Sequence, residues 1–236
     1  MKMRHWIYFS IVLLAFALHS TTSAGQTFSV LYSFKGRPDG NAPFAGVTSD
    51  SYGNLYGTTL EGGESDCGTV FQIDPSGTET VLYSFPCDDF AHPESGLILD
   101  GAGDIFGTSY GNFEIPYGGV FKIDRVHGKV ALHHFTANGG HNPIGGVVRD
   151  PDGNLYGTTS LGGAQSRGTV FKLSPSGKET VLYDFINNGD PVEAAGPLVL
   201  DRNGNVFGTS LEGGNLFYGT VFKLDPQGVL TMLHDF

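Results

Sequence analysis

The chain has 236 residues and a formal net charge of −11, with 13 Lys and Arg residues against 24 Asp and Glu residues. A strongly acidic surface repels phosphate backbones, so nucleic acid is not expected as a partner. Glycine occurs 36 times, which is about twice its usual share. The glycines recur at regular intervals, and the composition therefore indicates a turn-rich repeat fold rather than a low-complexity chain.

Residues 1–24 have the pattern of a secretion signal. Lys2 and Arg4 give a basic start, Ile7–Leu18 is an apolar run, and Ala24 ends a stretch of small residues where cleavage is expected. The apolar run is shorter than the about twenty residues that a membrane-spanning helix needs. We therefore expect a mature chain of residues 25–236 with no membrane span, exported to the periplasm, the cell surface or the medium.

The remainder of the chain is built from repeats. The phrase Leu-Tyr-Ser-Phe at residues 31–34 returns in similar form at Leu82, Leu132, Leu182 and Leu233. Self-similarity at a period of about fifty residues is typical of stacked supersecondary units. We predict one repeat domain over residues 25–236, with repeats at 35–85, 86–135, 136–185 and 186–236.

Turn residues divide each repeat into four short runs rich in β-branched and aromatic residues. In the first repeat these are Phe44–Ser49, Asn54–Thr59, Thr69–Asp74 and Glu79–Phe85, and we expect them to form strands a, b, c and d. The a–b connections combine Asp with Gly, as tight hairpins require. No apolar stripe of helical period is present, so helices are not expected.

Regular repetition of four antiparallel strands predicts an all-β, β-propeller-like fold with four four-stranded blades, since sandwiches do not repeat in this way. Apolar residues fall on both faces of the strands, as a blade between two neighbours requires. A fifth d-like segment at Thr27–Phe34 predicts an extra N-terminal strand. Two arrangements stay open: a closed ring of four blades, or an open arc of a larger propeller.

Several phrases together resemble the bacterial GloVer tandem repeat. The third repeat carries them best, with Asn-Leu-Tyr-Gly-Thr-Thr at 154–159, a Gly-Gly loop, Gly-Thr-Val-Phe-Lys-Leu at 168–173 and Val-Leu-Tyr-Asp-Phe at 181–185. The resemblance covers residues 27–236, and the strand order is more distantly similar to NHL-type blades. The resemblance to the GloVer repeat implies an exported protein of unassigned activity. Many members carry a C-terminal sorting anchor, and because none follows Phe236, that fate is not expected here.

The two cysteines lie in one hairpin. Cys67 precedes strand c and Cys87 follows strand d, so both lie at the same end of adjacent strands. This placement permits the short Cα separation that a disulfide needs, and export places the pair where disulfides persist. We predict a structural disulfide that contributes on the order of 3 kcal/mol.

The b–c loops and the d–a linkers leave the same end of the blades, and they vary most between repeats. Variable loops on a rigid scaffold are the usual place for binding residues. Their carboxylates, amides and histidines suit sugar hydroxyls or cations. The candidate ligand-binding residues are Asp39, Asn41, Glu61, Asp88, His92, Glu94, Asn112, Asn138, His141, Asn187, Asp190 and Glu212.

No catalytic residue, metal site or cofactor is predicted. The Gly-Xaa-Ser-Xaa-Gly pattern at residues 107–111 ends a strand, whereas the serine-hydrolase elbow needs a strand-to-helix turn. His133 and His134 are neighbours in a strand and point to opposite faces. Calcium would need six or more oxygens with a bidentate Glu, and hairpin chemistry already explains the Asp-rich turns.

Three functions follow from the sequence. The favoured one is a non-enzymatic binding module that uses the loop face for a polysaccharide, a cell-envelope ligand or a protein. The second is a metal-dependent lactonase- or lyase-like propeller enzyme, but strand a begins with small residues such as Ala45, Gly96 and Gly145 instead of ligands. The third is a structural protein whose open edges pair between chains.

Overall fold

The computed structural model describes residues 27–87, 90–111, 117–124, 128–136, 139–186 and 189–236. The chain divides into two compact units, Met1–Val30 and Leu31–Phe236. The predicted signal at residues 1–24 lies outside the described residues. Among the described residues, all regular structure belongs to the second unit and is entirely β.

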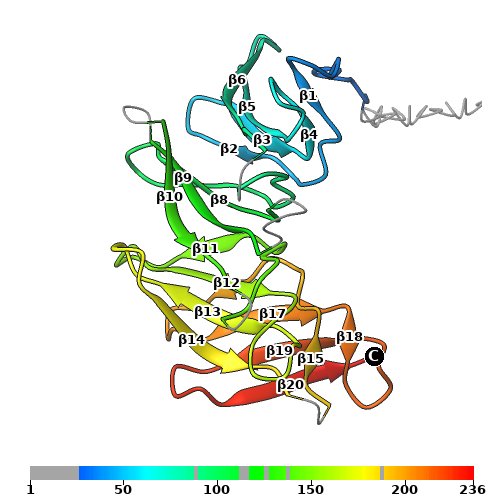
Figure 1. Ribbon diagram of the computed structural model, residues 1–236, viewed down its shortest axis with the longest axis vertical. Helices are drawn as coiled ribbons and strands as arrows, with labels where there is room; N and C mark the ends of the chain where they lie inside the picture. The colour runs from blue at the N-terminus through cyan, green and yellow to red at the C-terminus, as the bar shows by residue number, and fades with distance from the viewer. Residues whose placement is uncertain (1–26, 88–89, 112–116, 125–127, 137–138, 187–188) are drawn as a thin grey trace, which may run out of the picture. The chain divides into compact units, whose positions relative to one another are not determined.

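Four four-stranded antiparallel sheets, one for each repeat, form the fold (Figure 1). Blade 1 contains β2 (Thr48–Ser49), β3 (Leu55–Thr59), β5 (Thr69–Ile73) and β6 (Glu79–Ser84). Blade 2 contains β7 (Ile98–Leu99), β8 (Ile105–Ser109), β9 (Gly119–Asp124) and β10 (Gly128–His134). Blade 3 contains β11 (Val147–Arg149), β12 (Leu155–Thr159), β13 (Thr169–Leu173) and β14 (Glu179–Asp184). Blade 4 contains β16 (Val199–Leu200), β17 (Val206–Ser210), β19 (Thr220–Leu224) and β20 (Leu230–Asp235).

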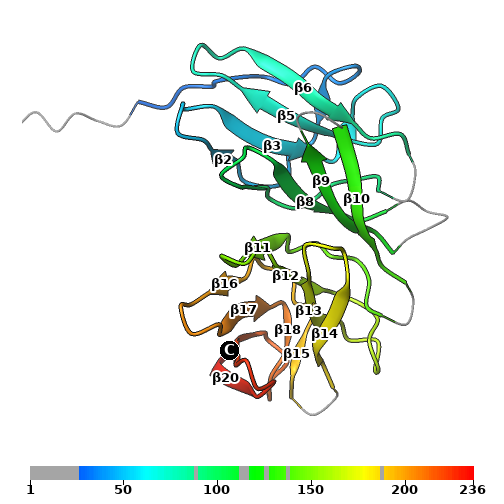
Figure 2. The same cartoon turned by 90° about the vertical axis from the view of Figure 1, so that its left-hand side faces the viewer.

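The order of strands in each sheet is a-b-c-d, as predicted, and Figure 2 shows β8, β9 and β10 side by side in blade 2. The register is the same in every blade, because a glycine of strand b always pairs with a phenylalanine of strand c. Gly57 pairs with Phe71, and Gly157 pairs with Phe171. A Cβ atom on Gly157 would lie 2.5 Å from the Phe171 ring, so only glycine leaves room for that ring.

The a–b hairpins are closed by their aspartates. The Asp50 carboxylate accepts hydrogen bonds from the backbone N–H groups of Tyr52 and Asn54, both at 2.9 Å, and from Asn54 Nδ2 at 2.8 Å. These bonds, above all the one from the Asn54 side chain, lower the pKa of Asp50. Asp150 and Asp201 accept the same Asn bonds in their own turns. The aspartates are therefore turn residues.

Consecutive blades share their hydrophobic cores. The phenylalanine after strand d of one blade packs against the strand-c phenylalanine of the next. The ring centroids lie 5.2 Å apart for Phe85 and Phe121, and 5.0 Å apart for Phe135 and Phe171. Each of the three core clusters draws on two consecutive repeats. This two-sided burial is the pattern that the sequence predicted for stacked blades.

Hydrogen bonds from buried threonines join the same neighbours. Thr58 Oγ1 in strand b of blade 1 donates to Ser95 O of the next linker at 3.0 Å. Thr158 Oγ1 donates to Ala194 O at 2.7 Å, and Thr108 Oγ1 donates to Pro143 O. The linkers that lead into blades 2, 3 and 4 are thus each tied to the blade before them.

The expectation of an extra N-terminal strand needs correction. Residues 27–35 form no strand, because the described residues contain no unpaired strand c beside them. The segment Leu31–Phe34 nevertheless occupies the position of a strand d against blade 1. The Phe34 ring lies 4.9 Å from the Phe71 ring, and Tyr32 Oη donates to Asp39 Oδ2 at 2.8 Å. Tyr183 and Asp190 make the equivalent bond, also at 2.8 Å.

The predicted disulfide is confirmed. Cys67 and Cys87 are joined, with their Cα atoms 5.1 Å apart. The bond connects the start of strand c to the end of strand d on the loop side of blade 1. In the part of the chain that the structure describes, no helix is long and apolar enough to cross a membrane.

Candidate functional site

The d–a linkers and the b–c loops lie on one face, because they pair with each other within each blade. In blade 1, β1 (Gly40–Asn41) pairs with β4 (Glu61–Gly62). In blade 4, β15 (Pro191–Val192) pairs with β18 (Glu212–Gly213). Blade 3 has a single bridge between His141 and Leu161 at the same place. The loop face is therefore a hydrogen-bonded surface that the blades support.

One residue in each linker adopts the left-handed backbone region at the same repeat position. The four are Ala42, His92, Asn142 and Glu193, with φ between 52° and 58°. Each carbonyl accepts a hydrogen bond from the residue after strand b, with Leu60 N at 3.0 Å from Ala42 O and Tyr110 N at 3.1 Å from His92 O. This conformation is uncommon for residues other than glycine. Its recurrence shows that the blades fix the backbone at this position of each linker.

Just beyond these residues, the starts of the four strands a line one pocket, which we call the strand-a pocket. Its volume is about 680 Å³. The lining comes from residues 44–48, 94–98 and 144–148, together with Ala195, Pro197 and Leu211. Most of these side chains are apolar or small. A mostly apolar pocket with a few polar groups is the usual form of a small-ligand site.

Glu94 is the ionisable side chain among the described residues of this lining. Its burial disfavours the charged form and raises the pKa of the carboxyl group, and nearby His92 opposes this shift. His92 itself is turned toward blade 1, with Nδ1 3.0 Å from Leu60 O. Across the same pocket, the Phe44 side chain is 77% exposed. The pocket thus combines an open aromatic ring with a partly desolvated carboxylate.

Two of the predicted ligand residues hold the linkers in place. The Asp39 carboxylate accepts Tyr32 Oη and the Lys35 N–H, and Asp190 accepts Tyr183 Oη and the Ile186 N–H. The bond to Asp39 is the main cause that raises the pKa of Tyr32 to about 12. Burial and the bond to Asp190 raise the pKa of Tyr183 to about 12. Asp190 stabilises the turn that follows strand d of blade 3, and Asp39 stabilises the equivalent turn after the segment Leu31–Phe34.

The other predicted residues are spread over the loop face. Asn41 Nδ2 donates to Glu61 Oε2 at 2.8 Å, and both side chains are exposed, as is Glu212. The His141 ring packs edge-on against Tyr117 at 5.3 Å. Of the predicted ligand-binding residues that the structure describes, Glu94 alone lines the strand-a pocket. Four further predicted residues lie outside the described residues: Asp88, Asn112, Asn138 and Asn187.

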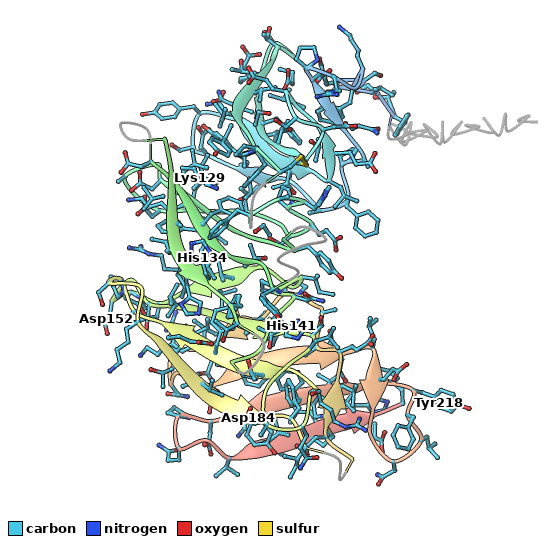
Figure 3. All side chains as sticks on the ribbon, viewed as in Figure 1. Lys129, His134, His141, Asp152, Asp184 and Tyr218 are labelled. Carbon is cyan, nitrogen blue, oxygen red and sulfur yellow. A yellow bond between two sulfur atoms is a disulfide. The ribbon has the colours of Figure 1, made fainter. Side chains whose placement is uncertain are left out.

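Sequence reasoning missed the aromatic side chains of this face. Phe44 lines the pocket, and Tyr110 and Tyr218 in the b–c loops are 37% and 75% exposed. Tyr218 points away from β18 (Figure 3). Aligning the repeats would have indicated Phe44, because it occupies the same repeat position as the predicted residue Glu94, and as Ile144 and Ala195. Within the described ranges, no group of three His, Cys, Asp or Glu residues is placed to hold a metal ion.

The sequence matches the Gloeobacter/Verrucomicrobia repeat over residues 16–195 and 79–236. No curated protein matches it. Among solved structures, a gluconolactonase from Xanthomonas campestris is similar at 16% identity and a TM-score of 0.52, over 79% of this chain and 60% of that one. A protein of unknown function from Bacteroides thetaiotaomicron has 11% identity and a TM-score of 0.54, over 82% and 44% of the two chains.

The extracellular domain of a protein described as a one-component system, also from Bacteroides thetaiotaomicron, is similar at 15% identity and a TM-score of 0.56. This likeness covers 88% of this chain and 24% of that one. The chain thus spans three fifths or less of these structures. At such identities the likeness establishes the propeller-like fold and no activity.

Proposed function

The chain belongs to the Gloeobacter/Verrucomicrobia repeat family, and from this premise we propose that it is an exported, non-enzymatic binding module for carbohydrate. The ligand binds on the loop face, with a sugar unit in the strand-a pocket. Export is supported by the basic and apolar N-terminal sequence and by the Cys67–Cys87 disulfide, which persists in oxidising compartments.

The pairing of Phe44 with Glu94 in one pocket is the observation that carries this proposal. A sugar ring has apolar C–H faces that pack on an exposed aromatic ring, and hydroxyl groups that donate to a carboxylate. Phe44 offers the first surface because its ring is largely exposed. Glu94 offers the acceptor in a partly desolvated setting, where a hydrogen bond is stronger than in water.

The backbone contacts of the described linker residues support the same function. Their left-handed residues and the carboxylates of Asp39 and Asp190 fix the backbone around the pocket before a ligand arrives. A preorganised surface loses less conformational entropy on binding. The exposed Asn41–Glu61 pair adds further polar groups at the rim of this face.

The enzyme alternative receives less support. A metal-dependent lactonase would need several carboxylates or amides that converge on one ion. The described lining of the strand-a pocket supplies the single carboxylate of Glu94 among apolar side chains. The Xanthomonas campestris gluconolactonase shares the fold at 16% identity, and a shared fold does not transfer an activity.

The test begins with the mature chain, residues 25–236, on an array of bacterial cell-envelope and environmental polysaccharide fragments. Binding of the best fragment is then measured by calorimetry for Phe44→Ala and Glu94→Gln. We expect each variant to bind about tenfold more weakly, because a charge-assisted hydrogen bond or an aromatic contact contributes about 1.5 kcal/mol.

Tyr52→Ala is the matched control. Tyr52 is 83% exposed and lies in the a–b turn, at the opposite end of the strands from the loop face. This variant should bind as the parent does. An array without binding, or equal losses in all three variants, would contradict the proposal.

A further inference from the structure

The outer flank of blade 4 exposes the side chains that the other blades bury against a neighbour. We define this flank by Thr209, Leu233, His234 and Phe236. Phe236 is 55% exposed, whereas its equivalent Phe185 is fully buried. Thr209 is exposed, while the equivalent threonines of blades 1 to 3 are buried and bonded to the next linker. The flank therefore has the composition of an internal interface.

The contact between His133 and Glu179, which joins blades 2 and 3, indicates what would fit this flank. His133 Nε2 of blade 2 lies 3.2 Å from Glu179 Oε2 of blade 3, and both side chains are 18% exposed. By repeat position, His234 in blade 4 corresponds to His133, and Glu79 in blade 1 corresponds to Glu179. His234 is exposed. Glu79 Oε1 is buried without a hydrogen-bond partner, as is Glu179 Oε1, so the two glutamates lie in similar surroundings. The equivalents of His133 and Glu179 therefore lie in the last and the first blade, as His234 and Glu79.

The face of blade 1 that bears Glu79 is covered by a short segment, Leu31–Phe34. This segment packs Phe34 on Phe71 but forms no strand ladder, and Leu31 remains 60% exposed. Its equivalents in later repeats, such as Leu82 and Leu182, pack against the core clusters shared with the next blade. The cover over blade 1 is therefore less extensive than the cover over blades 2 to 4.

We propose that the outer flank of blade 4 docks on blade 1 of a second copy of this chain and displaces Leu31–Phe34 from it. In this contact Phe236 packs on Phe71 of the second copy, as Phe135 packs on Phe171 within one chain. His234 meets Glu79, as His133 meets Glu179. Thr209 donates to a linker carbonyl, as Thr158 does.

The contact joins unlike surfaces, so it can either close or continue from copy to copy. In the proposed arrangement two copies use it twice and close into a dimer. Each copy has four four-stranded blades among its described residues, and a dimer would contain twice that number, within the roughly four to eight blades of closed propellers. The segment Leu31–Phe34 competes for blade 1 from within the same chain, at a high effective concentration. It therefore weakens the association and sets the protein concentration at which dimers form.

Sedimentation analysis of three chains over a range of concentrations tests the proposal. They are the mature chain 25–236, the chain 35–236 that lacks the segment, and Phe34→Ala in the mature chain, which loosens the segment without truncation. We expect dimers in the last two at concentrations about tenfold or more below those needed by the parent, because the competitor is removed or weakened. Monomers in both altered chains throughout the range would overturn the proposal.

Variants of the flank identify the contact. In the chain 35–236, Phe236→Ala and His234→Glu should each weaken dimerisation by about tenfold or more, the effect of losing a central anchor or of opposing two like charges. Glu79→Lys should restore dimerisation of the His234→Glu chain. Tyr218→Ala, an exposed aromatic of blade 4 outside the flank, is the control and should have no effect. Association that is insensitive to Phe236→Ala and His234→Glu would overturn the proposal.

Discussion

At the scale of single residues, the repeated glycine of strand b is a packing requirement. A Cβ atom at position 157 would meet the Phe171 ring at 2.5 Å and Gly146 O at 2.9 Å. Phe171 is fully buried, and its ring also packs against Phe135 of the preceding blade, with the centroids 5.0 Å apart. The smallest change at this position therefore disturbs the shared core of two blades.

Gly157→Ala should lower the free energy of unfolding by about 1–3 kcal/mol, the usual cost of overpacking a core. Gly101→Ala is the control, because no atom lies within 4 Å of its added Cβ. That variant should change stability by less than about 0.5 kcal/mol. Urea unfolding of both variants measures the difference, and equal midpoints would refute the packing argument.

Glu94 gives a prediction of pH dependence. Burial raises the pKa of its carboxyl group in the folded chain. A group whose pKa is raised by folding contributes stability that is complete below its unfolded pKa, about 4.3 for Glu. That contribution is lost as the pH rises through the folded value. Replacing the carboxyl by a neutral amide should therefore stabilise the protein at neutral pH and have little effect in acid.

Melting temperatures of Glu94→Gln and the parent at pH 7.5 and at pH 4 test this sign. The variant should melt higher at pH 7.5, and the difference should shrink at pH 4. The same variant is expected to bind carbohydrate less well. Glu94 would therefore lower the stability of the folded chain at neutral pH while it strengthens binding. A Glu94→Gln variant that is less stable than the parent at pH 7.5 would contradict this prediction, because it would mean that the folded chain stabilises the ionised carboxylate.

At the scale of elements, the threonines of strand b join one blade to the next linker. Thr158→Val keeps the side-chain shape and removes the hydrogen bond to Ala194 O. It should cost about 1–3 kcal/mol, because the buried carbonyl loses its partner. Thr209→Val is the control in an exposed equivalent position. Chemical unfolding at a low protein concentration compares the two, and similar losses in both would contradict this role.

The sequence predicted strands b, c and d to within one or two residues, because their apolar residues and turn signals repeat in register. It overestimated strand a, which pairs only at Thr48–Ser49 in blade 1 although Phe44–Ser49 was expected. Residues 44–47 leave the ladder after the left-handed Ala42 and line the pocket. Such a departure depends on the linker carbonyl bonds, which local propensity does not encode.

The candidate site was predicted in part. Strand order alone placed the b–c loops and d–a linkers on one face, and the β1–β4 pairing confirms it. The sequence did not separate Asp39 and Asp190, which hold the turns, from Glu94, which lines the pocket. All are carboxylates in linkers, and only the three-dimensional contacts distinguish them. The exposure of Phe44 could not be predicted from its residue type either, because phenylalanine is usually buried.

At the scale of the whole molecule, stability depends on nearest neighbours. Each core cluster belongs to two consecutive repeats, so a blade buries its faces only when adjacent blades are present. The phenylalanine that follows strand d is the repeated contact in this arrangement. Its contribution should depend on whether a further blade covers it.

Phe185→Ala should therefore lower the free energy of unfolding by about 3–5 kcal/mol, as expected for a buried aromatic. Phe236→Ala removes the same side chain from the exposed equivalent position and should cost less than about 1 kcal/mol in the monomer. Calorimetric unfolding at low concentration measures both values. A large loss for Phe236→Ala would mean that a surface within the same chain already covers the fourth blade.

Hydrogen exchange of the mature chain, with and without the best carbohydrate fragment, tests the central claim most directly. Binding at the strand-a pocket should slow exchange of backbone amides in residues 41–48 and 94–98, and leave the a–b turns such as 50–54 unchanged. At a fragment concentration near the dissociation constant of the parent, the Glu94→Gln variant should lose most of this protection, because it binds about tenfold more weakly. Protection confined to the a–b turns, or protection that persists in Glu94→Gln, would contradict a carbohydrate site on the loop face.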